Sequence, residues 1–276
     1  MSAFSLAALL MIVSGSLHAT VSALIKSGGD RYLHAAMMSA TSGVVALALI
    51  FFVPPPTGAW GWLALAIVLH LIYFNLLVRT LDRGDLSAAY PIFRGSAPLL
   101  TALVTIGMLG EPISAMALIG IVMIGGGILL MLRGRHASRE IVLLSLATGT
   151  MTACYTVVGA EGVRAVANPL SFILWLFLLM GVGNIVLLPR FTRNRLGDAF
   201  RSYGGSAILA GILSLGTFGL ALYALSLGPT AELAALRETG MITATVISIT
   251  LLGERVTISR IMAMMTILTG AILILL

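Results

Sequence analysis

Three charged residues of this sequence lie deep within runs of mainly apolar and small residues, where a charge needs a physical reason. They are Arg94, Arg237 and Glu238. At the helical rise of 1.5 Å per residue, Arg94 lies ~12 Å and Arg237 ~11 Å from the nearer end of its run. A charge at that depth in a membrane costs about 2.5 kcal/mol or more unless it faces a cavity or a partner. We predict that both arginines bind a substrate carboxylate; the alternative is that each is a structural pin paired with a protein carboxylate.

Glu238 follows Arg237 directly, but the two side chains are not expected to pair. Adjacent helical positions point ~100° apart around the axis. Three roles therefore stay open for Glu238: an ion pair with Arg94 from the other half of the chain, binding of a substrate ammonium group, or transfer of a coupled proton.

Six further residues are predicted to contribute to the same substrate site. They are aromatic, histidine or amide side chains within apolar runs: Tyr90, His18, His70, Asn75, Tyr155 and Tyr223. Tyr90 precedes Arg94 by four residues, so the two share a helix face. Pro91 and Pro98 predict kinks in this helix, with freed carbonyl groups lining a cavity. His70 is expected either to relay protons or to form a hydrogen bond within the bundle.

Other kinds of chemistry have no support in the sequence. It contains no phosphate-binding glycine loop, no zinc-ligand spacing and no nucleophile constellation. Cys154 is the single cysteine, which excludes a disulfide framework. No aromatic and basic module for nucleic acid is present. We therefore expect no enzyme activity, no cofactor, no bound metal and no nucleic-acid partner.

The composition predicts that these residues are positioned by membrane-spanning helices. The sequence is 59% hydrophobic and 9% charged, with a mean hydropathy of +1.09, whereas soluble domains have about 25% charged residues. Apolar runs near the ~20 residues that cross a bilayer lie at about 3–25, 33–53, 60–80, 86–108, 113–132, 141–162, 169–188, 205–227, 231–252 and 257–276. The expected fold is an all-α integral membrane protein with ten transmembrane helices.

The basic residues predict how these helices are oriented. Of the sixteen Lys and Arg residues, Arg94 and Arg237 lie inside spans and Arg164 lies on one side. The other thirteen lie at or beside the odd-numbered gaps: Lys26, Arg31, Arg79, Arg83, Arg133, Arg135, Arg139, Arg190, Arg193, Arg195, Arg201, Arg255 and Arg260. Because basic loops stay in the cytoplasm, we predict a multi-pass protein of the cytoplasmic (inner) membrane with both termini on the outer (periplasmic) side.

The two halves of the sequence form an internal repeat. With an offset of 143 residues, Arg94 aligns with Arg237, and Gly110-Glu111 aligns with Gly253-Glu254. Five spans per copy is an odd number, so the second copy must enter the membrane from the opposite side. We predict two inverted five-helix units around a central cavity, residues 1–137 and 138–276.

This pattern resembles the EamA-type members of the drug/metabolite transporter (DMT) superfamily. The resemblance rests on the ten-helix plan, the small residues of the fourth and ninth helices, and the Gly-Glu pairs before the fifth and tenth. It implies a basket of helices around a central cavity, with the fifth and tenth helices apart from the substrate path. It also implies export or import of amino acids, nucleosides, sugars or amphipathic drugs. Arg94 and Arg237 stand where most members have uncharged residues.

The leading hypothesis is a secondary active transporter for small anionic or zwitterionic metabolites, such as amino acids or derivatives. Export by alternating access is the expected direction. One alternative is a multidrug or organic-cation exporter with Glu238 as the substrate or proton site; another is a non-transporting membrane subunit. The expected partners are a small-molecule substrate and the lipid bilayer. The protein is predicted to be a monomer or a homodimer, since glycines such as Gly120 and Gly270 allow close helix contact within or between copies.

Overall fold

The computed structural model describes residues 2–26, 31–83, 86–133, 137–187, 192, 194–252 and 257–276. These residues form helices joined by short connections, and no strand is present among them. Eight of the helices are long and apolar enough to cross a membrane. The prediction of an all-α membrane protein is therefore confirmed, whereas the number of ten crossings and the inverted repeat stay predictions.

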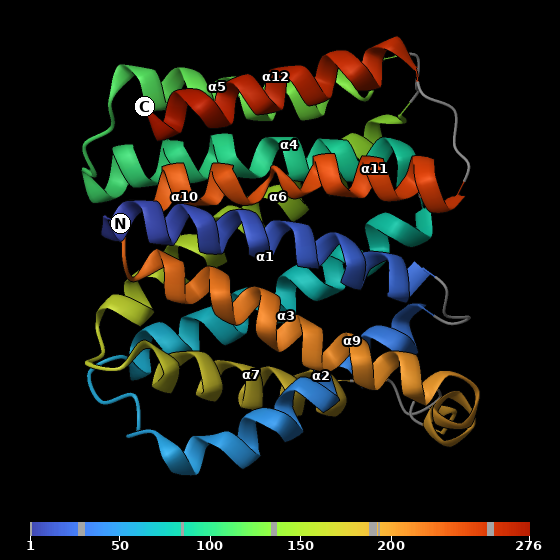
Figure 1. The fold of residues 1–276 in the computed structure, drawn as a ribbon. Helices are drawn as coiled ribbons and strands as arrows, with labels where there is room; N and C mark the ends of the chain where they lie inside the picture. Colours follow the sequence, from blue (N-terminus) through green and yellow to red (C-terminus); the bar gives the residue numbers. More distant parts are fainter. Residues whose placement is uncertain are drawn as a thin grey trace.

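The helices lie side by side along roughly one direction, and the two termini are at the same end of the bundle (Figure 1). The elements are α1 (Ala3–Lys26), α2 (Arg31–Leu49), the 3₁₀ turn η1 (Ile50–Phe52), α3 (Trp60–Arg83), α4 (Leu86–Val104), the π-helical turn η2 (Thr105–Leu109), α5 (Ala115–Leu130), α6 (Arg139–Arg164), α7 (Pro169–Val186), α9 (Leu196–Leu225), α10 (Thr230–Arg237), α11 (Gly240–Leu252) and α12 (Ile258–Leu275).

The predicted ninth span is divided into two helices, α10 and α11. At the break, the amide of Glu238 donates to the carbonyl oxygen of Ala235 at 2.9 Å, and the amide of Thr239 donates to that of Leu236 at 3.2 Å. The Thr239 hydroxyl donates to the same Leu236 carbonyl at 2.7 Å. These bonds tighten the chain into a 3₁₀-like turn, which ends α10 at Arg237.

Helix α1 crosses this break at very short range. A Cβ atom added to Gly15 would collide with the carbonyl oxygen of Arg237, and one added to Gly240 would collide with the backbone of Gly15. Only a pair of glycines lets the two backbones approach this closely. The crossing therefore ties the turn that carries Arg237 to α1.

The structure places the helix break beside Arg237 rather than beside Arg94. We expected irregular backbone in α4 because of Pro91 and Pro98, but α4 runs through both prolines as one helix. A proline removes one backbone hydrogen bond, and neighbouring helices can compensate for that loss in a bundle. The sharper interruption, between α10 and α11, contains no proline.

Helices α5 and α12 pack against each other along one edge of the bundle (Figure 1). A Cβ atom on Gly120 would lie 2.6 Å from the carbonyl oxygen of Gly270, and one on Gly127 would lie 3.1 Å from that of Ala263. These glycines are therefore used for contact within one chain. Of the two interpretations of the small residues, packing inside the bundle is the one that the structure shows.

Candidate functional site

Arg94 and Glu238 form a buried ion pair between the two halves of the chain. The Nε atom of Arg94 in α4 lies 3.0 Å from Oε2 of Glu238, which directly follows α10, and both side chains are less than a tenth exposed. Neither atom has a well-aligned hydrogen bond within the described part of the chain. The pair is thus a charge contact between the two halves of the chain, as one of the three expectations for Glu238 described.

Arg237 is equally buried but makes different contacts. Its Nε atom donates to the hydroxyl oxygen of Ser14 at 3.3 Å, and the Ser14 hydroxyl donates to the carbonyl of Thr217 at 2.7 Å. The guanidinium carbon lies 5.4 Å from the centre of the Phe218 ring, within the range of a cation–π contact. Among the described residues, no ion pair involves Arg237. Of the two buried arginines, therefore, only Arg94 is ion-paired among the described residues.

A group of stacked rings from α3, α6 and α9 adjoins Arg237 through Phe218. The rings of His70 and Tyr155 stack with their centres 4.2 Å apart, and Phe218 contacts both at 5.4 and 5.8 Å. Tyr73 packs edge-on against Tyr155 at 5.2 Å. We call Arg94, Glu238, Arg237, Ser14 and these four rings the central cluster. Stacked and edge-to-face contacts are the arrangements that aromatic pairs prefer.

His70 forms a hydrogen bond within its own helix. Its Nδ1 atom lies 2.7 Å from the carbonyl oxygen of Ala66. Because a carbonyl oxygen only accepts, Nδ1 carries the proton and Nε2 is left as an acceptor. The structure thus shows the bundle hydrogen bond for His70, while a role in proton relay stays a prediction.

The other predicted site residues divide into two groups. The ring of Tyr90 lies 5.8 Å from the guanidinium carbon of Arg94, as their spacing predicted. His18 lies in α1, four residues after Ser14 of the central cluster. Asn75 instead donates to the carbonyl of Leu71 at 2.9 Å and is exposed. Tyr223 is exposed as well. No hydrogen bond, ion pair or ring contact joins Asn75 or Tyr223 to the described central cluster, and their proposed role stays untested.

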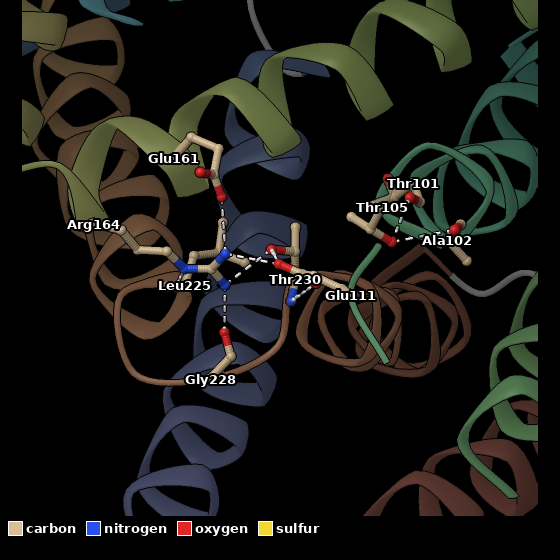
Figure 2. A network of polar contacts seen from close by, with 9 residues as sticks. All are labelled: Thr101, Ala102, Thr105, Glu111, Glu161, Arg164, Leu225, Gly228 and Thr230. Carbon is tan, nitrogen blue, oxygen red and sulfur yellow. Dashed lines mark hydrogen bonds and ion pairs between the residues drawn. The ribbon is translucent and has the colours of Figure 1, made fainter. Parts of the chain in front are cut away.

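A second polar network lies at one end of the bundle, where the loop before α5 meets the beginning of α10 (Figure 2). One carboxylate oxygen of Glu111 accepts from Nη1 of Arg164 at 2.7 Å and from the hydroxyl of Thr230 at 3.0 Å. The other accepts from the backbone amide of Thr230 at 3.1 Å. Glu111 therefore binds both Arg164 and the first turn of α10.

Arg164 binds residues from three chain segments through its guanidinium group. Besides Glu111, it donates to the carbonyl oxygens of Leu225 at 3.1 Å and Gly228 at 2.7 Å. It also donates to the Glu161 carboxylate and to the Thr230 hydroxyl, each at 3.0 Å. We call Glu111, Glu161, Arg164, Gly228 and Thr230 the Glu111 network. The loops after the fourth, sixth and eighth predicted helices meet here, as alternating crossings require.

Comparison with known proteins identifies the family. The model of the EamA-like transporter family matches residues 5–133 and 139–276. The chain belongs to this family. It is therefore a multi-pass membrane protein of the DMT type, and members of this family are transporters rather than enzymes.

A solved structure titled "Crystal structure of protein" has the fold of this EamA-like transporter. The TM-score is 0.75 at 17% sequence identity, and the match covers 98% of this chain and 95% of the other. At that identity the likeness shows the fold alone. No curated protein matches the chain.

Several residues of the central cluster and of the Glu111 network were not predicted from the sequence. Ser14, Tyr73 and Phe218 have side chains that are common in any apolar helix, and only their contacts distinguish them. A weak signal existed for two of them: Tyr73 lies three residues after His70, and Ser14 lies four residues before His18, on the same helix faces. The sequence marked Glu111 only as a repeated Gly-Glu pair.

Proposed function

We propose that this EamA-like protein is a secondary active transporter that moves small anionic or zwitterionic metabolites, such as amino acids or their derivatives, outward by alternating access. The observation that carries the proposal is Arg237. It is buried and forms no ion pair with the described residues, whereas Arg94 is already paired with Glu238. A buried cluster with one excess positive charge favours an incoming anion.

Arg94 and Arg237 have different roles in this proposal. Arg94 holds Glu238, and Arg237 offers its two terminal Nη atoms to the substrate, since no hydrogen bond joins them to the described residues. A carboxylate can accept two parallel hydrogen bonds from one guanidinium group. The rings of Tyr155 and Phe218 provide an apolar face for the rest of the molecule.

The proposed location in the cytoplasmic membrane rests on the distribution of the basic residues. Their excess at the odd-numbered gaps supports insertion in the cytoplasmic membrane with both termini outside. The common end of the termini in Figure 1 supports an even number of crossings.

The proposal is tested with purified protein in proteoliposomes and a panel of labelled amino acids, their N-acyl derivatives and organic cations. Arg237→Gln keeps a polar, hydrogen-bonding side chain but removes the charge. Because a hydrogen bond to a charged group contributes about 1.5–3 kcal/mol, flux of the transported anion should fall about tenfold or more. Arg83→Gln is the matched control, since Arg83 is exposed. Unchanged anion flux in Arg237→Gln would exclude the proposed binding role.

The cation-exporter alternative assigns a different role to Glu238. In that mechanism Glu238 binds the substrate, so Arg94 must release it in every cycle. Glu238→Gln should then abolish the export of cations while Arg237→Gln has little effect. The ion pair with Arg94 favours the anion hypothesis, because it already occupies the carboxylate.

A further inference from the structure

Helix α10 connects the Glu111 network to the central cluster. It is only eight residues long, and every residue from Thr230 to Arg237 is buried. Its first residue is bound by Glu111, and its last residue is Arg237, followed directly by Glu238. At 1.5 Å per residue, the helix spans ~12 Å between the two sites. A displacement of its beginning would therefore be transmitted to both charged residues.

The contact at the beginning of α10 is a helix cap supplied by another part of the chain. Pro229 occupies the N-cap position and provides no side-chain hydrogen bond. The Glu111 carboxylate takes over this role by accepting from the amide and hydroxyl of Thr230. A carboxylate satisfies the unpaired amides of a helix N-terminus and interacts favourably with its dipole. Gly110 has a φ of +63°, which glycine adopts readily and which shapes the turn before Glu111.

Both ends of α10 are points at which the chain departs from the helix. Gly228-Pro229 precedes it, and the turn at Glu238-Thr239 follows it. The Arg164–Glu111 pair is partly exposed, with side chains 29% and 21% accessible, so water can replace its contacts. The Arg94–Glu238 pair is 8% and 5% accessible. Contacts at the Glu111 end therefore break more easily than those at the central cluster.

We propose that Glu111 and Arg164 are positioning residues: they hold α10, and through it Arg237 and Glu238, in a closed arrangement, and their release from Thr230 opens this end of the bundle during transport. The proposal rests on the proposed function in assigning Arg237 to the substrate. It adds that substrate binding at Arg237 and opening at Glu111 are mechanically linked by one short helix.

The first experiment measures access to α10 without any substrate. A cysteine is introduced by Ala234→Cys, since Ala234 is a small and buried residue of α10, in a Cys154→Ser background. Labelling by a membrane-impermeant maleimide is followed in right-side-out and inside-out vesicles. Glu111→Ala should raise the labelling rate about fivefold or more from the Glu111 side, because the rate follows the population of the open form. Glu111→Gln should give a smaller rise, since its amide oxygen can still accept from Thr230.

The matched control breaks an ion pair at the opposite end of α6. Arg83 pairs with Glu140 there, and both side chains are more than half exposed. Glu140→Gln should leave the labelling of Ala234→Cys unchanged from the Glu111 side. A labelling rate that is the same in Glu111→Ala and in the parent protein would overturn the proposal.

A second experiment remains informative if Glu111→Ala does not fold. Glu111→Cys and Thr230→Cys are combined in the Cys154→Ser background and joined by a short bifunctional thiol reagent that a reductant cleaves. Flux should fall about tenfold or more on cross-linking, because the end that must open is closed in every molecule, and return on reduction. Full flux in the cross-linked protein would overturn the proposal.

The two proposals fail in different ways. If Arg237→Gln abolishes anion flux but Glu111→Ala leaves labelling unchanged, the positioning role is wrong and the substrate assignment stands. If labelling rises in Glu111→Ala but no anion is transported, α10 moves as proposed and the substrate class is wrong.

Discussion

Arg94 and Arg237 occupy equivalent positions in the two sequence halves but have different environments. Arg94 faces a carboxylate, Glu238, whereas Arg237 faces a hydroxyl and an aromatic ring. The difference arises because Glu238 aligns with Gly95, so only one half supplies an acidic residue at this level. One glutamate cannot balance two guanidinium groups, and the excess charge remains on Arg237, which has no ion pair among the described residues.

At the scale of single residues, the Arg94–Glu238 pair should be strongly coupled. Replacing one partner leaves the other charge buried, which costs about 3–5 kcal/mol. We expect Arg94→Gln to lower the thermal unfolding midpoint in detergent far more than Arg83→Gln. The double variant Arg94→Gln/Glu238→Gln should recover most of that loss, because two neutral amides replace the pair. Additive effects of the two substitutions would show that the pair does not form.

At the scale of elements, the break between α10 and α11 lies at the crossing with α1. The carbonyl of Arg237 lies against Gly15, and the backbone of Gly15 lies against Gly240. The prolines of α4 did not produce such a break, although they were the more visible sequence signal. The helix is therefore interrupted at a tertiary contact rather than at a proline.

Gly15→Ala is the direct test of this crossing. The added methyl group has no space against the Arg237 carbonyl, so the turn and the Arg237 side chain must shift. We expect lower thermal stability by about 1–3 kcal/mol and reduced anion flux. The control is Gly126→Ala in α5, which has open space around the new methyl group and should be neutral or stabilising by up to ~1 kcal/mol. A stable, fully active Gly15→Ala protein would contradict the close crossing.

At the scale of the whole molecule, the sequence predicts that both termini lie outside the cytoplasm. Reporter enzymes that are active only outside the cytoplasm, fused to either terminus, should both be active, because thirteen basic residues flank the odd-numbered gaps. A fusion in the loop after Arg133 should be inactive. Opposite activities at the two termini would show an odd number of crossings and would contradict the ten-helix prediction.

The sequence by itself determined that the helices lie in a lipid bilayer and which residues carry the buried charges. Continuous apolar runs must be helical in a bilayer, where every backbone group needs an internal partner, and the EamA-like family match and the spanning helices agree with that. It also identified Arg94, Arg237 and Glu238, since buried charges are rare in apolar segments.

Only the tertiary structure decided which of these charges meet. Helical periodicity relates residues up to about four positions apart, whereas Arg94 and Glu238, Ser14 and Arg237, and Glu111 and Thr230 come from distant segments. For the same reason the sequence did not reveal that α10 ends at Arg237, because the turn depends on the backbone of α1. The family pattern supplied the helices, and the packing between them assigned one arginine to Glu238 and left the other without an ion pair among the described residues.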